Sequence, residues 1–217
     1  MGTEIRFALD FRNKRFNDAS KGLAALAKEL NADWDGAAKV LSKELQSFLN
    51  SVAEALAKRH GNAWPGGTGE KTLSRRSGKL VASILSSVTV TGTHYDEIKG
   101  YIGAAFPGPV HEYGATIRPK TAKFLTVPLP AALNPNGTPK KKSAREWQNT
   151  FVARTKAGNL VIFQKTGTQI IPLYVLRTMV KIKPRLGMQE TISAGLPYFV
   201  DRAADQIVRA MLAGASK

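Results

Sequence analysis

The sequence predicts an α+β fold with long N-terminal helices, a small antiparallel β-sheet built from hairpins, and a C-terminal helix. Three observations predict this class. Apolar residues recur at intervals of three and four over residues 31–59, and helical spacing returns over residues 188–211. Between them, residues 87–104 and 150–165 each contain two short strand-like runs joined by a turn, as β-hairpins do.

The N-terminal part contains one expected strand and two expected helices. Residues 4–11 alternate as a strand does, and residues 17–30 place Leu and Ala on one helical face. The next helix is expected to begin near Asn31 or Asp33, because either side chain could cap the free N–H groups, and to end near Arg59. Its length of roughly 40 Å would cross a whole domain or reach a neighbouring subunit.

Loops and short helices are expected after the long helix. Five residues of segment 60–69 are Gly or Pro, so a loop is expected there. Ser77 and Gly78 are expected to begin a short amphipathic helix. Residues 110–113 are expected to form one helical turn that ends at Gly114, since glycine readily adopts the positive φ of a helix stop.

The second half of the chain is expected to be mainly β. Short strands are expected over residues 116–118 and 124–127, and a longer strand over residues 173–182. Residues 134–145 have no apolar face and are expected to form an exposed loop. Pro197 is expected to break the C-terminal helix, since proline lacks the N–H that a helix interior uses.

A chain of 217 residues fits one domain with elaborations, because domains usually contain about 50 to 250 residues. The expected organisation is a single domain over residues 1–217. Its parts are a helical N-terminal part at 1–60, a mainly β core at 61–186 with an exposed basic loop at 134–145, and a helical C-terminal part at 187–217. A hydrophobic fraction of 43% is enough to build a core, so disorder throughout is not expected.

Positive charge is the most unusual property of the composition. The chain has 32 Lys and Arg against 16 Asp and Glu, a formal net charge of +16, whereas a magnitude of roughly 2 to 8 suffices for solubility. Residues 104–217 carry +12 of this charge. Between Tyr113 and Gln189 the one acid is Glu146, against 14 Lys and Arg. This asymmetry indicates nucleic acid, an acidic protein or a membrane surface as partner.

The chain contains no cysteine, so neither a disulfide framework nor a thiolate metal site is expected. No apolar run approaches the roughly 18 residues that span a bilayer. The N-terminus mixes charges at Arg6, Asp10, Arg12 and Lys14 and does not have the apolar core of a signal peptide. We therefore expect synthesis in the cytoplasm and no membrane partner.

No catalytic or metal-binding group of residues is predicted. His60, His94 and His111 fall in different expected elements, and none has the spacing of known metal ligands. His111 and Glu112 are adjacent on a helical turn and point in different directions, which favours a packing role over acid–base chemistry. The sequence therefore predicts a protein that is not an enzyme and has no cofactor.

The sharpest electrostatic feature is the cluster of Lys140, Lys141, Lys142 and Arg145. On an exposed, mobile loop, these side chains could contact phosphates without reading any base. A solvated charge run explains the cluster alone equally well, but the depletion of acids around it favours contact with DNA or an anionic ring. No zinc finger, basic-region heptad or aromatic RNA-binding motif accompanies the cluster, so sequence-specific recognition is not expected.

Three short motifs follow one another after the long helix. They are His60-Gly61-Asn62-Ala63-Trp64-Pro65, then Arg76-Ser77-Gly78-Lys79-Leu80 with Ser83-Ile84, then Val110-His111-Glu112-Tyr113-Gly114. In this order they resemble the virion-morphogenesis and tail-completion proteins of tailed bacteriophages. The resemblance covers residues 38–128, with a weaker similarity over residues 171–192.

The resemblance implies a structural component of the virion neck or tail end. The implied partners are further copies of the chain in a homo-oligomeric ring, with six the favoured number, the head connector or stopper, tail terminator or tail-tube proteins, and the phage DNA that passes through the lumen. The insertion at residues 129–147 lies outside the resemblance. The implied scaffold residues are Trp64, Arg76, Ser77, Gly78, Leu80, His111, Glu112, Tyr113 and Gly114.

A function of a different class would also explain the charge, namely a free DNA-binding protein that coats or condenses nucleic acid. Such a protein binds DNA tightly as an isolated subunit, and its affinity falls steeply with salt. A neck subunit is expected to bind strongly only when a ring arrays its charges. An enzyme carried by the virion, such as a nuclease or peptidoglycan hydrolase, is the least supported class, because paired acids and metal ligands are missing at usable spacing.

Overall fold

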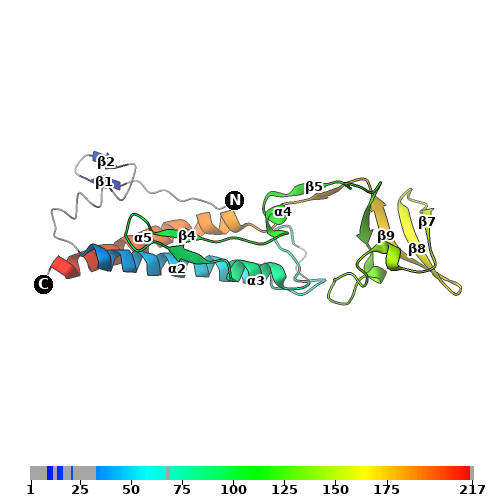
Figure 1. Cartoon of the computed structure of the whole chain (residues 1–217), viewed down its shortest axis with the longest axis horizontal. Helices are drawn as coiled ribbons and strands as arrows, with labels where there is room; N and C mark the ends of the chain where they lie inside the picture. The colour runs from blue at the N-terminus through cyan, green and yellow to red at the C-terminus, as the bar shows by residue number, and fades with distance from the viewer. Residues whose placement is uncertain (1–8, 12–13, 17–20, 22–32, 67–68, 216–217) are drawn as a thin grey trace. The chain divides into compact units, whose positions relative to one another are not determined.

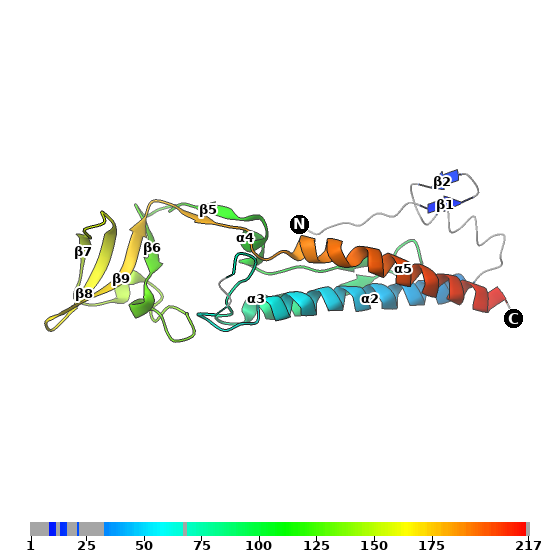
Figure 2. The same cartoon turned by 180° about the vertical axis from the view of Figure 1, so that it is seen from behind.

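The computed structural model describes residues 9–11, 14–16, 21, 33–66 and 69–215 (Figures 1 and 2). Its α+β class confirms the prediction. The chain divides into two compact units, which are described in turn. The helical unit is formed from Met1–Ala57, Ala82–Ala105 and Gly187–Lys217, and the sheet unit from Lys58–Val81 and Phe106–Leu186.

The long helix α2, Trp34–Arg59, forms where the sequence predicts it. Asp33 lies at its N-terminus and accepts a hydrogen bond on Oδ1 from the N–H of Gly36 at 2.8 Å, as a capping side chain does. The helix therefore begins beside Asp33, one of the two predicted caps, and Asn31 lies outside the described residues. Its buried residues are Ala37, Ala38, Leu49, Val52, Ala53 and Leu56.

The C-terminal helix α5, Met188–Ala215, lies antiparallel to α2 in the helical unit. The rings of Phe48 and Phe199 stack with centroids 4.9 Å apart. At the end of the pair, the N–H of Asp33 donates to the carbonyl of Met211 at 3.4 Å. These two contacts show that α2 and α5 run in opposite directions, and the apolar stripe of each helix is buried against the other.

The predicted break at Pro197 is wrong, because α5 continues through it. Pro197 is exposed, as is Ser193, whose carbonyl would otherwise accept the hydrogen bond that proline cannot donate. Solvent can therefore satisfy that carbonyl. Ile192 and Phe199, on either side of the proline, are 5% exposed each, so packing keeps both halves of the helix in place.

A predicted hairpin lies on α2. Its strands, β3 (Thr89–Thr91) and β4 (Lys99–Tyr101), pair antiparallel as expected. Gly100 approaches α2 so closely that a Cβ added to it would lie 2.6 Å from Cδ1 of Leu49. The short helix α3, Lys79–Leu85, precedes the hairpin and begins directly after Gly78, also as predicted.

Only part of the predicted N-terminal structure falls within the described residues. The strand predicted over residues 4–11 is described as β1, Leu9–Phe11, which pairs antiparallel with β2, Lys14–Phe16. Residues 4–8 lie outside the described part. The helix predicted over residues 17–30 also lies outside it, apart from Lys21.

The sheet unit contains a four-stranded antiparallel sheet in the order β6-β9-β8-β7. The predicted hairpin over residues 150–165 is confirmed as its β7–β8 pair. Ala132, Leu173 and Tyr174 form a buried cluster on this sheet. The strands are β6 (Leu125–Pro128), β7 (Thr150–Arg154), β8 (Leu160–Thr166) and β9 (Gln169–Arg177).

The single strand predicted over residues 173–182 is wrong. β9 ends at Arg177, and a separate strand β10, Val180–Ile182, pairs with β5, Ala115–Ile117. The phase of the apolar alternation changes at Met179 and Val180, and this change marks the interruption. The β5–β10 pair forms a two-stranded ribbon of its own.

The helical turn predicted before Gly114 is confirmed as α4, Gly108–Tyr113. Gly114 has φ 74° and leads directly into β5. Among the described residues, no helix is both long and apolar enough to span a membrane.

Candidate nucleic-acid interface

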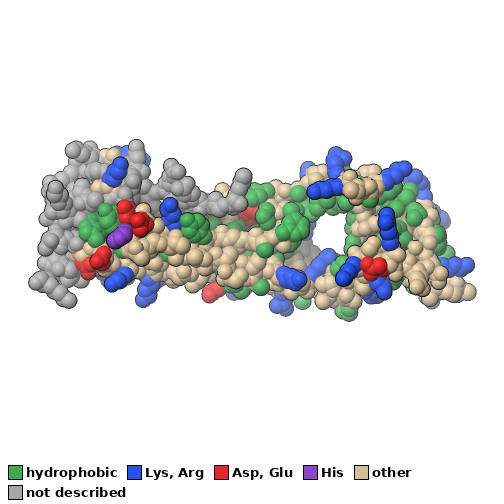
Figure 3. All heavy atoms as spheres, in the orientation of Figure 1, with side chains coloured by type: hydrophobic (Ala, Val, Ile, Leu, Met, Phe, Trp, Pro, Cys, Tyr) green, Lys and Arg blue, Asp and Glu red, His purple; other side chains and the backbone are tan. Residues whose placement is uncertain are grey.

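The two units differ sharply in charge. The sheet unit contains 20 Lys and Arg against three Asp and Glu, whereas the helical unit contains 12 against 13. All of the positive excess of the chain therefore belongs to the sheet unit. Figure 3 shows Lys and Arg side chains gathered around that unit, with few acids between them. Self-repulsion at this charge density is unfavourable and is relieved by an anionic partner.

The basic cluster predicted from the sequence lies on a turn next to the four-stranded sheet. Lys141, Lys142 and Arg145 are exposed there. Lys140 is exposed as well, but its ammonium donates to the carbonyl of Ala131 at 3.0 Å. A 3₁₀ turn, Ala144–Glu146, carries Arg145. Three of the four cations of the cluster thus have side chains without a hydrogen bond or ion pair to any described residue.

The loop predicted over residues 134–145 is exposed at most of its positions, and contacts within and beside it anchor it to the sheet unit. The indole N–H of Trp147 donates to the hydroxyl of Tyr174 at 3.0 Å, and Ala144 packs on the buried cluster of the sheet. Gly137 is buried, because Trp64 covers it. Small and aromatic residues within and beside the polar run therefore anchor it, although the run has no continuous apolar face.

Trp64 joins two of the sequence motifs to this turn. The guanidinium of Arg76 lies over the indole of Trp64, 4.4 Å from the ring centroid, in a cation–π contact. The same indole lies against Gly137, where an added Cβ would be 2.6 Å from Cγ of Trp64. Trp64 thus contacts both Arg76 and Gly137 within the sheet unit, and the scaffold role that the resemblance implies for Trp64 and Arg76 stays a prediction.

Gly137→Ala is expected to lower the free energy of unfolding of the sheet unit by about 2 kcal/mol, through the cost of φ +77° and displacement of the indole. Chemical denaturation of the full chain measures this loss. The double variant with Trp64→Ala isolates the contact, since removing the ring removes the clash. Strictly additive losses would show that Gly137 and Trp64 do not constrain each other.

The remaining scaffold residues lie in the sheet unit or at its boundary. Gly78 has φ +75°, which suits the tight entry to α3 that the sequence predicts. Ser77 and Tyr113 are exposed, the latter by 63%. Leu80 and Glu112 are half-buried. The described contacts give Ser77 no hydrogen-bond partner.

His60 is a buried residue that is not among the site residues predicted from the sequence, although the first of the three motifs contains it. Its side chain is 2% exposed. The N–H of Leu73 donates to Nδ1 at 3.1 Å, so Nδ1 carries no proton. Nε2 therefore carries the proton and donates to the carbonyl of Leu186 at 2.9 Å. Both ring nitrogens make these hydrogen bonds only when the imidazole is neutral and carries its proton on Nε2.

His111 holds the same segment of chain through its backbone. Its carbonyl accepts hydrogen bonds from the N–H groups of Arg185 at 2.6 Å and Leu186 at 2.9 Å. Its Nδ1 is buried, without a hydrogen-bond partner among the described residues. The two histidine motifs therefore meet at Leu186, directly before the chain enters α5.

Acidification is expected to destabilise the sheet unit through both histidines. Burial lowers the pKa of His60 and of His111 below the usual 6.5, and the positive charge of Arg185 lowers the pKa of His111 further. The unfolded chain then binds protons that the folded chain does not, so stability present above about pH 6.5 is lost as pH falls below it. Thermal melts from pH 8 to pH 5 measure this loss, and a flat profile would contradict it.

The sequence analysis did not predict the cationic face of the β5–β10 ribbon. Lys181 lies opposite Thr116 in the register, so their side chains share one face. Arg118 and Lys183 each follow directly after one of these strands, two residues beyond Thr116 and Lys181 along the chain. The only signal in the sequence is the apolar–basic alternation of residues 180–183, which does not reveal the partner strand.

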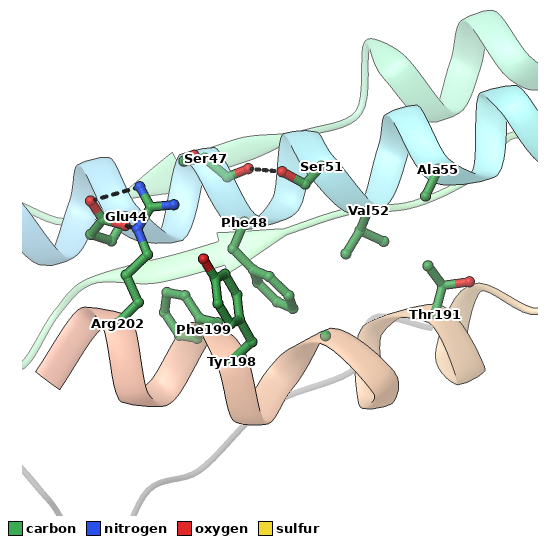
Figure 4. Close-up of a pocket in the computed structure, with 11 residues that line it drawn as sticks. Glu44, Ser47, Phe48, Ser51, Val52, Ala55, Thr191, Tyr198, Phe199 and Arg202 are labelled. Atoms are coloured by element: carbon green, nitrogen blue, oxygen red, sulfur yellow. Dashed lines mark hydrogen bonds and ion pairs between the residues drawn. The ribbon is translucent and has the colours of Figure 1, made fainter.

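The helical unit has a groove of about 260 Å³ between α2 and α5 (Figure 4). Its charged side chains, Glu44 and Arg202, pair with each other at 2.8 Å. The hydroxyl of Ser51 donates to the carbonyl of Ser47. The groove therefore offers a packing surface. No group of three or more His, Asp or Glu side chains among the described residues could hold a metal ion.

Comparison with family models, with curated proteins and with solved structures finds no match to this chain. The bacteriophage resemblance of the three motifs therefore stays a prediction.

Proposed function

We propose that this protein is a structural component of the neck or tail end of a tailed bacteriophage, where it acts in tail completion or head–tail joining. It forms a homo-oligomeric ring between the capsid connector and the tail, and DNA passes through the ring. The observation that carries the proposal is the confinement of all excess positive charge to the sheet unit. The motif order around Trp64, Gly78 and Gly114 adds support.

The division of charge suits two different contacts. A nearly neutral helical unit can pack against neighbouring copies without long-range repulsion, and closed symmetry is the usual way in which identical subunits satisfy such contacts. The strongly basic sheet unit suits the phosphate backbone of DNA, which it can hold without reading sequence. This arrangement needs neither a cofactor nor a catalytic residue, so the proposal is of a non-enzymatic virion protein.

The second candidate is a free protein that coats or condenses DNA without sequence specificity. The same basic unit supports it. The two candidates differ in what an isolated subunit does, because a coating protein binds DNA tightly as a monomer. A ring subunit gains most of its affinity when many copies present their charges together.

The deciding experiment combines assembly with binding. Sedimentation of the purified chain over a range of concentrations should reveal a closed oligomer, and the chain should restore joining to heads and tails produced without it. A chain that stays monomeric and fails to restore joining would refute the neck proposal. Tight, salt-sensitive binding of DNA by that monomer would favour the coating protein.

A further inference from the structure

We propose that the β5–β10 ribbon is the surface that contacts the phosphate backbone of double-stranded DNA, through Arg118, Lys181 and Lys183. This inference deepens the proposed function, because it rests on DNA as the partner and names the residues that touch it. It also moves the contact away from the lysine cluster on which the sequence places it.

The ribbon separates its residue types by face. Thr116 and Lys181 lie directly opposite each other, and Arg118 and Lys183 are the residues directly after β5 and β10. The other face carries the apolar residues Ala115, Ile117, Val180 and Ile182. Thr116, Arg118, Lys181 and Lys183 are all exposed, whereas Ala115, Val180 and Ile182 are half-buried and Ile117 is 38% exposed. The exposed charged residues of the ribbon and its ends are therefore all cations.

Within the described part of the chain, these cations have no anionic partner. Arg118, Lys181 and Lys183 make no side-chain hydrogen bond or ion pair with any residue that the structure describes. The two strands contain no acid, and Glu146 is the one acid between Tyr113 and Gln189. An anion that reaches this face therefore meets no competing carboxylate within the ribbon.

The spacing of the cations suits a duplex backbone. Residues two apart in a strand are separated by roughly 6.7 Å, and paired strands by roughly 4.8 Å. Phosphates along one strand of duplex DNA advance by about 3.4 Å along the axis and also wind around it, so the spacing of Lys181 and Lys183 is of the same order as that of successive phosphates. Backbone pairing of β5 with β10 fixes Lys181 before DNA arrives, and Arg118 and Lys183 lie one residue beyond the paired strands.

The cluster of Lys140, Lys141, Lys142 and Arg145 is less suited to this contact. The ammonium of Lys140 already donates to the carbonyl of Ala131. Glu146 follows Arg145 directly in the same 3₁₀ turn and places a negative charge beside it. The cluster therefore contributes to the general positive field, whereas the ribbon provides an ordered row of contacts.

The test compares two variants that each lose three charges. The ribbon variant is Arg118→Gln, Lys181→Gln and Lys183→Gln; the control variant is Lys140→Gln, Lys141→Gln and Lys142→Gln. Fluorescence anisotropy follows binding of a labelled random-sequence DNA duplex to the full chain, in its assembled form, at several salt concentrations. Each lost phosphate contact lowers the slope of log K against log salt by about 0.9, so the ribbon variant should lose roughly 2.7.

The control variant should lose less than about 1 in the same slope. Equal losses, or a larger loss in the control, would overturn the ribbon proposal, and so would absence of duplex binding by the unmodified chain at the lowest salt. A charge-preserving variant, Arg118→Lys with Lys181→Arg and Lys183→Arg, should retain the slope. Its failure to do so, with folding verified by circular dichroism, would also overturn the proposal.

The outcome is separable from the neck proposal. Ring formation and joining of heads to tails can be scored on the ribbon variant itself. If the variant binds DNA as the unmodified chain does and still joins particles, the ribbon assignment is wrong and the neck proposal stands. If the unmodified chain neither assembles nor joins particles, the neck proposal is wrong regardless of how the ribbon behaves.

Discussion

Replacing Gly114 with alanine is expected to lower the free energy of unfolding of the sheet unit by about 3 to 5 kcal/mol. Gly114 has φ 74° and ψ 166°, a backbone region that is almost closed to other residues. An added Cβ would also lie 2.9 Å from the carbonyl oxygen of Ile182 and 3.1 Å from Cδ of Pro184. Because Ile182 is paired with Ala115 in the ribbon, its backbone cannot move away freely.

Gly158→Ala is the matched control for this prediction. Gly158 also has a positive φ, +78°, but no atom lies within 4 Å of the position of an added Cβ. Its variant should lose only about 1 to 2 kcal/mol, the cost of the backbone conformation alone. Denaturant titration of both variants compares them. Equal losses would mean that the end of β10 yields to the new methyl group and that the ribbon backbone is less fixed than the structure indicates.

Local signals in the sequence were sufficient for several elements. A capping aspartate at Asp33 and an apolar stripe define α2, because both act within a few turns of one helix. The helical turn before Gly114 and the β7–β8 hairpin are likewise determined by neighbouring residues. Such elements are predictable since the groups that stabilise them lie close together in the chain.

The features that the sequence did not predict depend on packing between residues that are far apart in the chain. Pro197 has the same local chemistry in any helix, and only the burial of Ile192 and Phe199 keeps α5 continuous across it. The pairing of β10 with β5 joins segments far apart in the chain, and no local pattern specifies it. Residues 58–81 likewise join the sheet unit although they precede the second half of the chain.

The sequence predicts the class of partner, an anion, but not which residues form the candidate interface. Composition alone indicates an anionic partner, and the depletion of acids after Tyr113 points to the part of the chain that forms most of the sheet unit. Consecutive lysines such as Lys141 and Lys142 stand out in a sequence, whereas Arg118 and Lys181 become neighbours only once two strands pair. A linear reading therefore favours clusters of consecutive charges over faces that the fold assembles.

His60→Ala is expected to destabilise the chain by about 4 kcal/mol, the second large effect. The substitution leaves a cavity at a side chain that is only 2% exposed. It also removes the partners of two backbone groups, the N–H of Leu73 and the carbonyl of Leu186. Each buried polar group left unpaired adds roughly 1 to 3 kcal/mol unless water reaches it.

The pH dependence of this variant separates the role of His60 from general loss of packing. Without His60, the loss of stability below about pH 6.5 should become shallower, since His111 is then the one buried histidine that still resists protonation. His94→Ala, in an exposed turn, is the control for the loss of a histidine side chain and should leave stability unchanged. A profile as steep in His60→Ala as in the unmodified chain would show that groups other than His60 cause the acid sensitivity. Thermal melts of the three proteins between pH 8 and pH 5 therefore decide whether the neutral imidazole of His60 holds Leu73 and Leu186 together.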